Sequence, residues 1–373
     1  MNLNRRRLNI LVINWQDIRH PLAGGAEVHL HEIFRRVAAE HEVTLLCCGF
    51  EGAPPEEGVD GMRVVRRGER NFFNYVVPAA YRALRRRTCY DIVLDDLNKI
   101  PFFTPLYVRE PILAIAHHFF GKSIFKEVSP QYGAYVLGSE YLVRHVYRRT
   151  PFAVVSESTR QELLQWKMQG EIHLLPNAVD LHRYRPSAPV SEPIIGYLGR
   201  LKKYKSVDHL IRALPLIMER VAGARLLIIG GGDAEPELRR LTAELGLERR
   251  VIFTGHVTQE DKVRRINECA VIVNPSPKEG WGLTVLEANA CAVPVVAADS
   301  PGLRDSVADG VTGVLYEYGN LTALANAVSA LLTDPEKRRH FQKNAVDWAR
   351  RWSWDASAEI AVQLIEKYVQ HKK

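Results

Sequence analysis

Residues 271–298 read VIVNPSPKEGWGLTVLEANACAVPVVAA. The apolar, β-branched runs at 271–274 and 294–298 predict two strands. Between them a loop containing Gly280 and Gly282 leads into a short helix that begins near Leu283. A strand, a helix and a second strand in succession form a βαβ unit, whose two strands run parallel.

The same alternation of short apolar runs and longer amphipathic stretches continues along most of the chain. Helical periodicity is clearest in residues 26–40, 207–220 and 234–245. Because the strands are rich in Val, Ile and Leu on both faces, we expect parallel sheets that are covered by helices on both sides. Besides the two strands above, we expect strands at residues 8–14, 42–47, 62–66, 91–94, 112–116, 152–155, 172–175, 194–198, 225–229, 251–253 and 314–316.

Residues 183–192 interrupt this alternation. Prolines and small polar residues gather there, as they do in linkers between domains. Since the alternation resumes afterwards, the sequence predicts an α/β protein with two facing, doubly wound, Rossmann-like domains and a cleft between them. We place these domains at residues 1–182 and 193–350. Residues 351–373 form a further amphipathic helix, which could pack back on either domain, with the N-terminal domain as the one we name.

The composition is that of a globular protein without membrane spans. Hydrophobic residues make up 46% of the 373 residues and charged residues 25%, which is the balance of an ordinary globular protein. No apolar run approaches the ~20 residues of a membrane span, and no signal-peptide pattern opens the chain. The five cysteines show no metal or redox spacing, so we interpret them as reduced core residues of a cytoplasmic protein.

The formal net charge of +7 favours a phosphorylated ligand or an anionic membrane as a partner. Nucleic acid is not expected, because no zinc-finger, RNP or similar motif accompanies the charge.

Ligands of open parallel sheets bind at the carboxyl ends of the strands, so the loops that follow strands carry the most information. In the opening stretch, Gly280 and Gly282 leave backbone amides uncovered before a helix N-terminus, which suits a diphosphate. Glu279 lies in the loop and Glu287 about one turn inside the helix. One carboxylate could accept hydrogen bonds from a sugar and the other from a ribose. The alternative is a tight turn with two solvated acids.

A second candidate follows the strand at 194–198, where Arg200 and Lys205 lie in a basic loop. Arginine binds phosphate oxygens in a bidentate manner and lysine adds a point charge, so the two would complete a diphosphate clamp. A plain basic surface loop is the alternative.

Two further glycine-rich turns, at Gly24-Gly25 and at 230–232, follow strands and could pass close to a nucleotide. We therefore assign Gly24, Gly25 and Gly232 to donor binding. The first turn lacks the third glycine and the acidic residue of a dinucleotide fingerprint, which argues against NAD. Neither turn ends in Gly-Lys-Ser/Thr, so nucleoside triphosphate hydrolysis is not expected.

Two adjacent histidines, His117 and His118, end the strand at 112–116. A histidine there can donate hydrogen bonds to a sugar or carry a proton, and neighbours in a strand point to opposite faces. We assign His117 to the reaction and His118, with Asn98, to the acceptor side. A structural role remains the alternative for either histidine. No His-Glu-x-x-His spacing occurs, and we expect neither a protein-bound metal nor a cofactor.

Together these segments resemble the retaining glycosyltransferases of family 4. Glu279 and Glu287 form the Glu-x7-Glu pair that is the signature of that family. The resemblance covers nearly the whole chain and is most specific in the second half. It is carried by the motifs at 24–27, 111–117, 155–156, 176–180, 199–205, 230–232, 275–287, 294–296, 302, 309–310 and 312–313.

The resemblance implies the GT-B fold, with the nucleotide bound in the C-terminal domain and the acceptor mainly in the N-terminal one. It implies that Arg200 and Lys205 hold the diphosphate, that Glu287 holds the ribose and that Glu279 contacts the transferred sugar. His117 matches the histidine of the family's N-terminal domain. Backbone amides around the start of the short helix would touch phosphate and sugar, at Gly282, Leu283 and Thr284.

The family also implies transfer without a metal and with retained anomeric configuration. The sequence departs from the family pattern at a few positions, which leaves the donor and acceptor open. They are Ala178, Ser206, Trp281, Ala292 and Pro301.

We thus expect transfer of a hexose-type sugar from a UDP- or GDP-sugar to a hydroxyl acceptor, in the synthesis of a glycan, a glycolipid or a glycosylated natural product. The alternatives are a sugar-nucleotide 2-epimerase and a non-catalytic sugar-nucleotide-binding protein.

Residues 75–87 suggest how a lipid-linked acceptor would be reached. This stretch sets apolar and aromatic side chains beside four arginines, which could rest on an anionic membrane at its inner face. The alternative is an ordinary solvated helix end. The side chains concerned are Tyr75, Val76, Val77 and Leu84 with Arg82, Arg85, Arg86 and Arg87.

Overall fold

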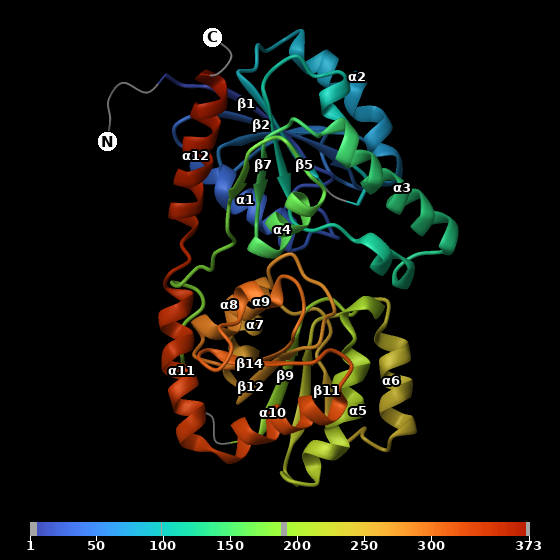
Figure 1. The fold of residues 1–373 in the computed structure, drawn as a ribbon, viewed down its shortest axis with the longest axis vertical. Helices are drawn as coiled ribbons and strands as arrows, with labels where there is room; N and C mark the ends of the chain where they lie inside the picture. The colour runs from blue at the N-terminus through green and yellow to red at the C-terminus, as the bar shows by residue number, and fades with distance from the viewer. Residues whose placement is uncertain (1–5, 98, 188–191, 371–373) are drawn as a thin grey trace. The chain divides into compact units, whose positions relative to one another are not determined.

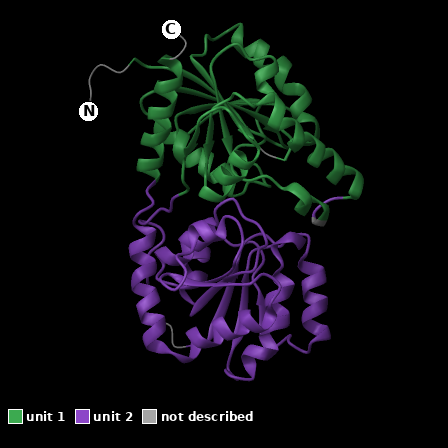
Figure 2. Cartoon of the chain, viewed as in Figure 1, with its two compact units in different colours: residues 1–125, 129–177, 354–373 green, residues 126–128, 178–353 purple. Residues whose placement is uncertain are grey.

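The computed structural model describes residues 6–97, 99–187 and 192–370. The chain divides into two compact units (Figure 2). Unit 1 comprises residues 1–125, 129–177 and 354–373, and unit 2 comprises residues 126–128 and 178–353. The main boundary falls between Asn177 and Ala178, ahead of the segment 183–192 that the sequence suggested as a linker.

Unit 1 is built on an eight-stranded sheet with the order β3-β4-β2-β1-β5-β6-β7-β8 (Figure 1). All neighbouring strands run parallel except β3 and β4. The strands are β1 (Asn9–Ile13), β2 (Glu42–Gly49), β3 (Glu56–Val59), β4 (Met62–Glu69), β5 (Ile92–Leu97), β6 (Ile112–Ala116), β7 (Phe152–Val154) and β8 (Ile172–Leu174).

The helices of unit 1 include one from the far end of the chain. Helix α12 packs against α1, and Figure 1 shows the two side by side. An ion pair of 2.5 Å between Arg36 Nε and Asp355 Oδ1 joins them. The C-terminal helix thus packs on the N-terminal unit. The helices are α1 (Gly25–Val37), α2 (Phe73–Arg85), α3 (Pro130–Val146), α4 (Glu157–Gln165) and α12 (Trp354–Gln370), with 3-10 turns η1 (Arg70–Phe72), η2 (Thr104–Leu106) and η3 (Gly121–Lys126).

Unit 2 is built on a six-stranded, wholly parallel sheet with the order β11-β10-β9-β12-β13-β14. Its strands are β9 (Ile194–Leu198), β10 (Arg225–Ile229), β11 (Val251–Phe253), β12 (Val271–Asn274), β13 (Val295–Ala298) and β14 (Gly313–Tyr316). Its helices are α5 (Val207–Met218), α6 (Glu235–Glu244), α7 (Gln259–Asn267), α8 (Leu283–Ala290), α9 (Leu303–Ser306), α10 (Leu321–Thr333) and α11 (Pro335–Ala349), with the 3-10 turn η4 (Lys203–Lys205).

The central strands of both sheets are buried on both faces, as their uninterrupted apolar sequences predict. Gly196 in β9 shows how closely the layers approach. A Cβ atom there would lie 2.4 Å from Ile272 Cδ1 and 2.6 Å from Cys269 Sγ, so only glycine fits. The doubly wound α/β fold predicted from the sequence is confirmed.

One strand was not predicted. Strand β3 pairs antiparallel with β4 through the two-residue turn Asp60-Gly61, and both turn residues have positive φ. Asp-Gly is a strong signal for such a hairpin, so the missing strand had a readable cue. The strand was missed because its sequence, EEGV, is polar, and an edge strand needs no apolar run.

Candidate functional site

The carboxyl ends of β9 and β12 bring two of the predicted loops together. These strands are parallel neighbours, so the loops that follow them leave from the same edge of the sheet. Lys205 ends η4 after β9, and Glu279 lies between β12 and α8. Lys205 Nζ lies 2.5 Å from Glu279 Oε1. One ion pair thus joins two residues that the sequence assigned to different parts of a ligand.

This ion pair is shielded from water, since the side chains of Lys205 and Glu279 are 15% and 14% exposed. Burial lowers the pKa of Lys205, but the charge of Glu279, the neighbouring Tyr204 and the hydrogen bond to Glu279 together raise it by more, so the pKa lies above its ordinary value. Lys205 is therefore cationic at neutral pH.

The backbone of the Glu279 loop is held by the turn that follows β13. Glu279 N donates to Pro301 O at 3.1 Å. Gly302 has a φ of 82°, and a Cβ atom there would lie 2.2 Å from Glu279 O. Because no side chain fits at Gly302, this glycine allows the turn to press against the loop and fix the position of Glu279.

Helix α8 begins at the predicted place. Gly282 precedes it with a φ of 93°, a left-handed conformation that favours glycine. Leu283 and Thr284 form its half-buried first turn, and Asn274 Nδ2 donates to Thr284 Oγ1 at 3.4 Å. The N–H groups of a first helical turn have no partner within the helix, so this end can receive an anion.

Glu287 lies one turn further along α8 and has two partners that the sequence did not suggest. Its Oε1 accepts hydrogen bonds from Tyr184 Oη at 2.8 Å and from Lys262 Nζ at 2.5 Å. Its Oε2 is buried and has no hydrogen-bond partner among the described residues. Tyr184 fell in the segment taken for a linker, and Lys262 resembled any surface lysine of α7, so neither carried a readable signal.

Arg200 and Gly232, the remaining residues of unit 2 that the sequence assigned to the donor, lie on the same edge of its sheet. Arg200 is exposed, and its backbone carbonyl accepts a hydrogen bond from the buried Tyr197 hydroxyl at 3.1 Å. Gly232 packs so closely that a Cβ atom would lie 2.3 Å from Leu201 O. The glycine at 232 thus brings the β10–α6 turn against the loop that carries Arg200.

In unit 1, the glycine pair opens helix α1. Gly24 precedes the helix, Gly25 is its first residue, and Gly24 N donates to Glu27 Oε2 at 2.6 Å. A carboxylate three residues into a helix that accepts this N–H is a recognised helix start. Glu27 thereby fixes the backbone of the loop where the sequence predicts contact with a ligand.

His117 is paired with a buried carboxylate that the sequence did not single out. His117 Nε2 lies 3.0 Å from Asp96 Oδ1 on the adjacent strand β5, and the Asp96 side chain is 1% exposed. Burial lowers the pKa of His117, but the charge and hydrogen bond of Asp96, with a smaller contribution from the charge of Glu27, raise it by more, so the net direction is upward. Asp96 Oδ2 has no hydrogen-bond partner within the described ranges.

A second imidazole lies beside this pair. The rings of His29 and His117 are 5.1 Å apart, edge to face. Burial, followed by the charge of His117, lowers the pKa of His29 to about 3, so His29 stays neutral. Its Nε2 lies 3.0 Å from Leu175 O and must carry the proton. The two neighbouring imidazoles thus differ: the pKa of His29 is lowered and His29 stays neutral, whereas the pKa of His117 is raised.

Of the two residues predicted to bind the acceptor, the structure describes only His118. The ring of His118 is half-buried and lies 4.5 Å from the ring of Phe120. Asn98 lies outside the described residues.

Two family models match adjoining parts of the chain. The one described as "Glycosyltransferase Family 4" matches residues 23–183, and the one described as "Glycosyl transferases group 1" matches residues 180–348. The chain belongs to glycosyltransferase family 4. The family to which the sequence motifs pointed is thus confirmed.

Curated relatives match over shorter segments. The D-inositol 3-phosphate glycosyltransferase of Nocardia farcinica is 36% identical over 218 residues, which are 54% of this chain and 48% of the relative. The GDP-mannose-dependent alpha-(1-6)-phosphatidylinositol monomannoside mannosyltransferase of Mycolicibacterium smegmatis is 34% identical over 210 residues, which are 51% of this chain and 55% of the relative. The chain spans about half the length of the curated relatives that it matches.

Solved structures of low identity resemble the chain over nearly its whole length. Sucrose-phosphate synthase from Thermosynechococcus elongatus has a TM-score of 0.82 at 24% identity, over 97% of this chain and 99% of the other. HepE from Anabaena, solved in complex with UDP-glucose, has a TM-score of 0.77 at 20% identity, over 97% of this chain and 100% of the other. The family 4 chain therefore has the GT-B fold.

The departures of this family 4 chain from the motif pattern have structural consequences. Ser206 and Ala292 replace glycines and have φ values of 53° and 58°, so both non-glycine residues take a left-handed conformation. Trp281 packs its buried ring 4.7 Å from the ring of Trp352. Pro301 contributes the carbonyl that accepts the N–H of Glu279.

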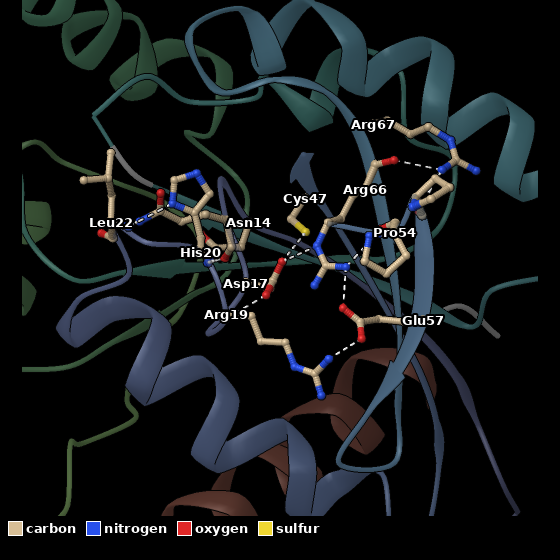
Figure 3. Close-up of polar contacts among 12 residues, drawn as sticks. Asn14, Asp17, Arg19, His20, Leu22, Cys47, Pro54, Glu57, Arg66 and Arg67 are labelled. Carbon is tan, nitrogen blue, oxygen red and sulfur yellow. Dashed lines mark hydrogen bonds and ion pairs between the residues drawn. The ribbon is translucent and has the colours of Figure 1, made fainter. Parts of the chain in front are cut away.

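A buried ion pair that no sequence motif predicted supports the β1–α1 loop of this family 4 chain. Arg66 on β4 donates from Nε to Asp17 Oδ2 at 2.7 Å, and the two side chains are 1% and 2% exposed. Figure 3 shows Glu57 and Cys47 beside the pair, each in contact with one member. Since Asp17 lies between β1 and the Gly24 turn, Arg66 anchors the loop that leads to that turn.

Some expectations about the surface were wrong. Val77 and Leu84 are buried in unit 1, so they do not face a membrane, and Cys89 is exposed rather than in the core. Within residues 6–97, 99–187 and 192–370, no helix has the length and apolar character needed to cross a bilayer. In the same ranges, no group of three or more His, Cys, Asp or Glu side chains is placed to hold a metal ion.

The described cavity of about 770 Å³ in unit 2 lies between α7 and the segment before β9. Charged side chains of both signs line it, and none of the predicted site residues does. It is lined by Asp180, His182, Arg183, Arg185, Pro186, Ser187, Glu260, Val263, Arg264, Asn267 and Glu268.

Proposed function

We propose that this chain transfers a hexose-type sugar from a UDP- or GDP-sugar to a hydroxyl acceptor, with retained anomeric configuration and without a metal ion. The observation that carries the proposal is the Lys205–Glu279 ion pair beside the start of α8. A cation, a carboxylate and a helix N-terminus on one edge of a parallel sheet suit a sugar diphosphate.

The donor assignment draws on the relatives. One is named as GDP-mannose-dependent, and a neighbour was solved with UDP-glucose, so both bases are candidates for this chain. Glu287 would bind the ribose through its unpartnered Oε2, and Glu279 would contact the transferred sugar. Gly24, Gly25 and Gly232 would approach the donor through their backbones.

Departure of the nucleoside diphosphate places negative charge on the leaving oxygen as an oxocarbenium-like state forms. Arg200, Lys205 and the first turn of α8 would stabilise that charge. His117 would bind a sugar hydroxyl through Nδ1, since its Nε2 faces Asp96. Attack by the acceptor hydroxyl from the side that the diphosphate leaves would retain configuration.

Incubating the protein with UDP- and GDP-hexoses and a panel of hydroxyl acceptors tests this function. We expect a glycosylated product with the donor's anomeric configuration by proton NMR, formed equally well after EDTA treatment. An inverted linkage would contradict retention, and loss of activity with EDTA would contradict metal independence. Release of an epimerised sugar, or tight donor binding without turnover, would favour the two alternative functions.

We also propose that unit 1 binds an anionic membrane peripherally and takes a lipid-linked acceptor there, on the cytoplasmic side. Phe72 and Tyr75 are 63% and 67% exposed at the start of α2, where large aromatic side chains normally avoid water. Tyr75 Oη lies 3.0 Å from Tyr135 Oη on α3, which extends the aromatic surface. Exposed arginines at the end of α2 supply the charge for anionic lipids.

Flotation with vesicles tests membrane binding. The wild-type protein should float with vesicles that contain phosphatidylserine and not with pure phosphatidylcholine. The double change Arg82→Glu and Arg86→Glu should abolish flotation, whereas Lys337→Glu with Arg339→Glu on α11 of unit 2 should not. Equal recovery with both vesicle types would reject the proposal.

A further inference from the structure

We infer that Tyr184 and Lys262 are positioning residues that hold one oxygen of Glu287 and leave the other for the ribose of the donor. The inference rests on the proposed function, in which Glu287 binds that ribose. It concerns residues outside the Glu-x7-Glu motif, one from the segment before β9 and one from α7.

Both donors act on the same oxygen. Tyr184 Oη lies 2.8 Å and Lys262 Nζ lies 2.5 Å from Glu287 Oε1, while Oε2 is buried without a hydrogen-bond partner in the described part of the chain. A carboxylate that is free to rotate would share its donors between both oxygens. The two contacts therefore fix the plane of the carboxylate and leave Oε2 as its unpartnered oxygen.

Tyr184 is well suited to this task. It is 5% exposed, so packing fixes the direction of its hydroxyl. Its one proton could also reach Gln259 Oε1 at 3.2 Å, but the charged oxygen of Glu287 is closer and the stronger acceptor. Burial and then the charge of Glu287 raise the pKa of Tyr184, so the hydroxyl stays protonated and remains a donor.

Lys262 neutralises the carboxylate. Its ammonium also lies 5.5 Å from the centre of the Tyr184 ring, so the three side chains form one cluster. Since Glu287 is 13% exposed, its charge would otherwise be poorly solvated and would repel an approaching diphosphate. The cluster thus presents a hydrogen-bond acceptor without a net negative charge, which is what a neutral ribose diol attached to an anion requires.

The test compares the affinities for UDP and 2′-deoxy-UDP by calorimetry, with GDP and 2′-deoxy-GDP in parallel. The preference is the ratio of the affinity for UDP to that for 2′-deoxy-UDP, or the same ratio for the guanine nucleotides. It reports the ribose contact alone, because the two ligands differ only in the 2′-hydroxyl. In Tyr184→Phe we expect the preference to fall by about fivefold to tenfold. This is less than the full contribution of a hydrogen bond to a charged group, because the variant misplaces the carboxylate of Glu287 without removing it. Affinity for inorganic pyrophosphate should not change.

Tyr316→Phe is the matched control, because Tyr316 is a buried tyrosine of the same unit whose hydroxyl has no hydrogen-bond partner among the described residues. Its preference should equal that of the wild type. If Tyr184→Phe does not fold, Lys262→Met provides a second variant, in which the preference for UDP over 2′-deoxy-UDP should fall by the same factor.

An unchanged preference in the folded variants overturns the inference while leaving the proposed function intact. A wild-type protein that binds the ribo- and deoxyribonucleotides equally overturns the ribose role of Glu287 itself, and one that binds no nucleotide overturns the proposed function. The outcomes are therefore distinguishable.

Discussion

Lys205 and Glu279 form a shielded ion pair across the edge of the second sheet, with Nζ and Oε1 2.5 Å apart. The proposed roles assign the lysine to the diphosphate and the glutamate to the sugar. Binding of a donor would then exchange one anionic partner of Lys205 for another. Glu279 both holds the lysine in place and competes with the ligand for it.

Removing a clamp cation should weaken nucleotide binding. Lys205→Ala and Arg200→Ala should each lower the affinity for the preferred nucleoside diphosphate about 10- to 100-fold by calorimetry, the range for a charge-assisted hydrogen bond. Lys203→Ala is a control from the same turn, since the Lys203 side chain is 71% exposed. Wild-type affinity in both clamp variants would exclude these residues from the diphosphate site.

Neutralising Glu279, which competes with the ligand for Lys205, should strengthen nucleotide binding. Glu279→Gln removes a negative charge beside Lys205, so the affinity for the free nucleoside diphosphate should rise by a few-fold, since partly shielded charges interact by about 1 kcal/mol. Turnover should fall by at least ~10²-fold, because a positioned catalytic group is lost. Weaker nucleotide binding in this variant would show that Glu279 supports the clamp more than it opposes it.

The Asp96–His117 pair predicts a pH effect with a definite sign. Because the pKa of His117 is raised in the folded protein, the pair's added stability is fully present below pH ~6.5, the unfolded value, and is lost as pH rises through the folded value. In Asp96→Asn the raising charge is gone and burial remains, so the pKa of His117 should fall below ~6.5. NMR titration of carbon-13-labelled histidine measures this shift.

The same variant can be followed by urea denaturation across pH. The difference in unfolding free energy between wild type and Asp96→Asn should be largest at acidic pH and shrink as pH rises through the folded pKa of His117. A difference that does not depend on pH would mean that Asp96 does not control protonation of His117.

The end of helix α8 predicts a stabilising substitution. Ala292 N donates to Asn289 O and Val293 N to Ala288 O, the pattern of a helix end that usually has glycine at the left-handed position. Ala292→Gly relieves a strain of ~1–2 kcal/mol against ~0.5–1 kcal/mol of added chain entropy in the unfolded state. We expect a rise in melting temperature of about 1–3 °C.

Helix α6 offers the reverse experiment. It ends with the same hydrogen bonds around Gly246, where a Cβ atom would meet nothing within 4 Å. Gly246→Ala should therefore lower the melting temperature by a similar amount through backbone strain alone. Equal effects of both substitutions in the same direction would contradict this account.

The sequence by itself determined the two doubly wound sheets and the edge of the second sheet on which the loops of Lys205 and Glu279 lie. Apolar runs such as 271–274 and 194–198 could only be parallel strands covered on both faces, and topology then places the loops that follow them together. The closeness of the loops that carry Glu279 and Lys205 could thus be predicted before any contact was known, because it follows from local pattern and connection rules.

The partners of these residues depended on tertiary structure. Tyr184 lies 103 positions from Glu287, and Asp96 lies 21 positions from His117. Nothing in a local pattern shows that a tyrosine before β9 or an aspartate within β5 will donate to or accept from a site residue. Hydrogen bonds of 3 Å depend on how distant segments pack. The burial that lowers the pKa of His29 and the contact with Asp96 that raises the pKa of His117 exist only once the layers have closed.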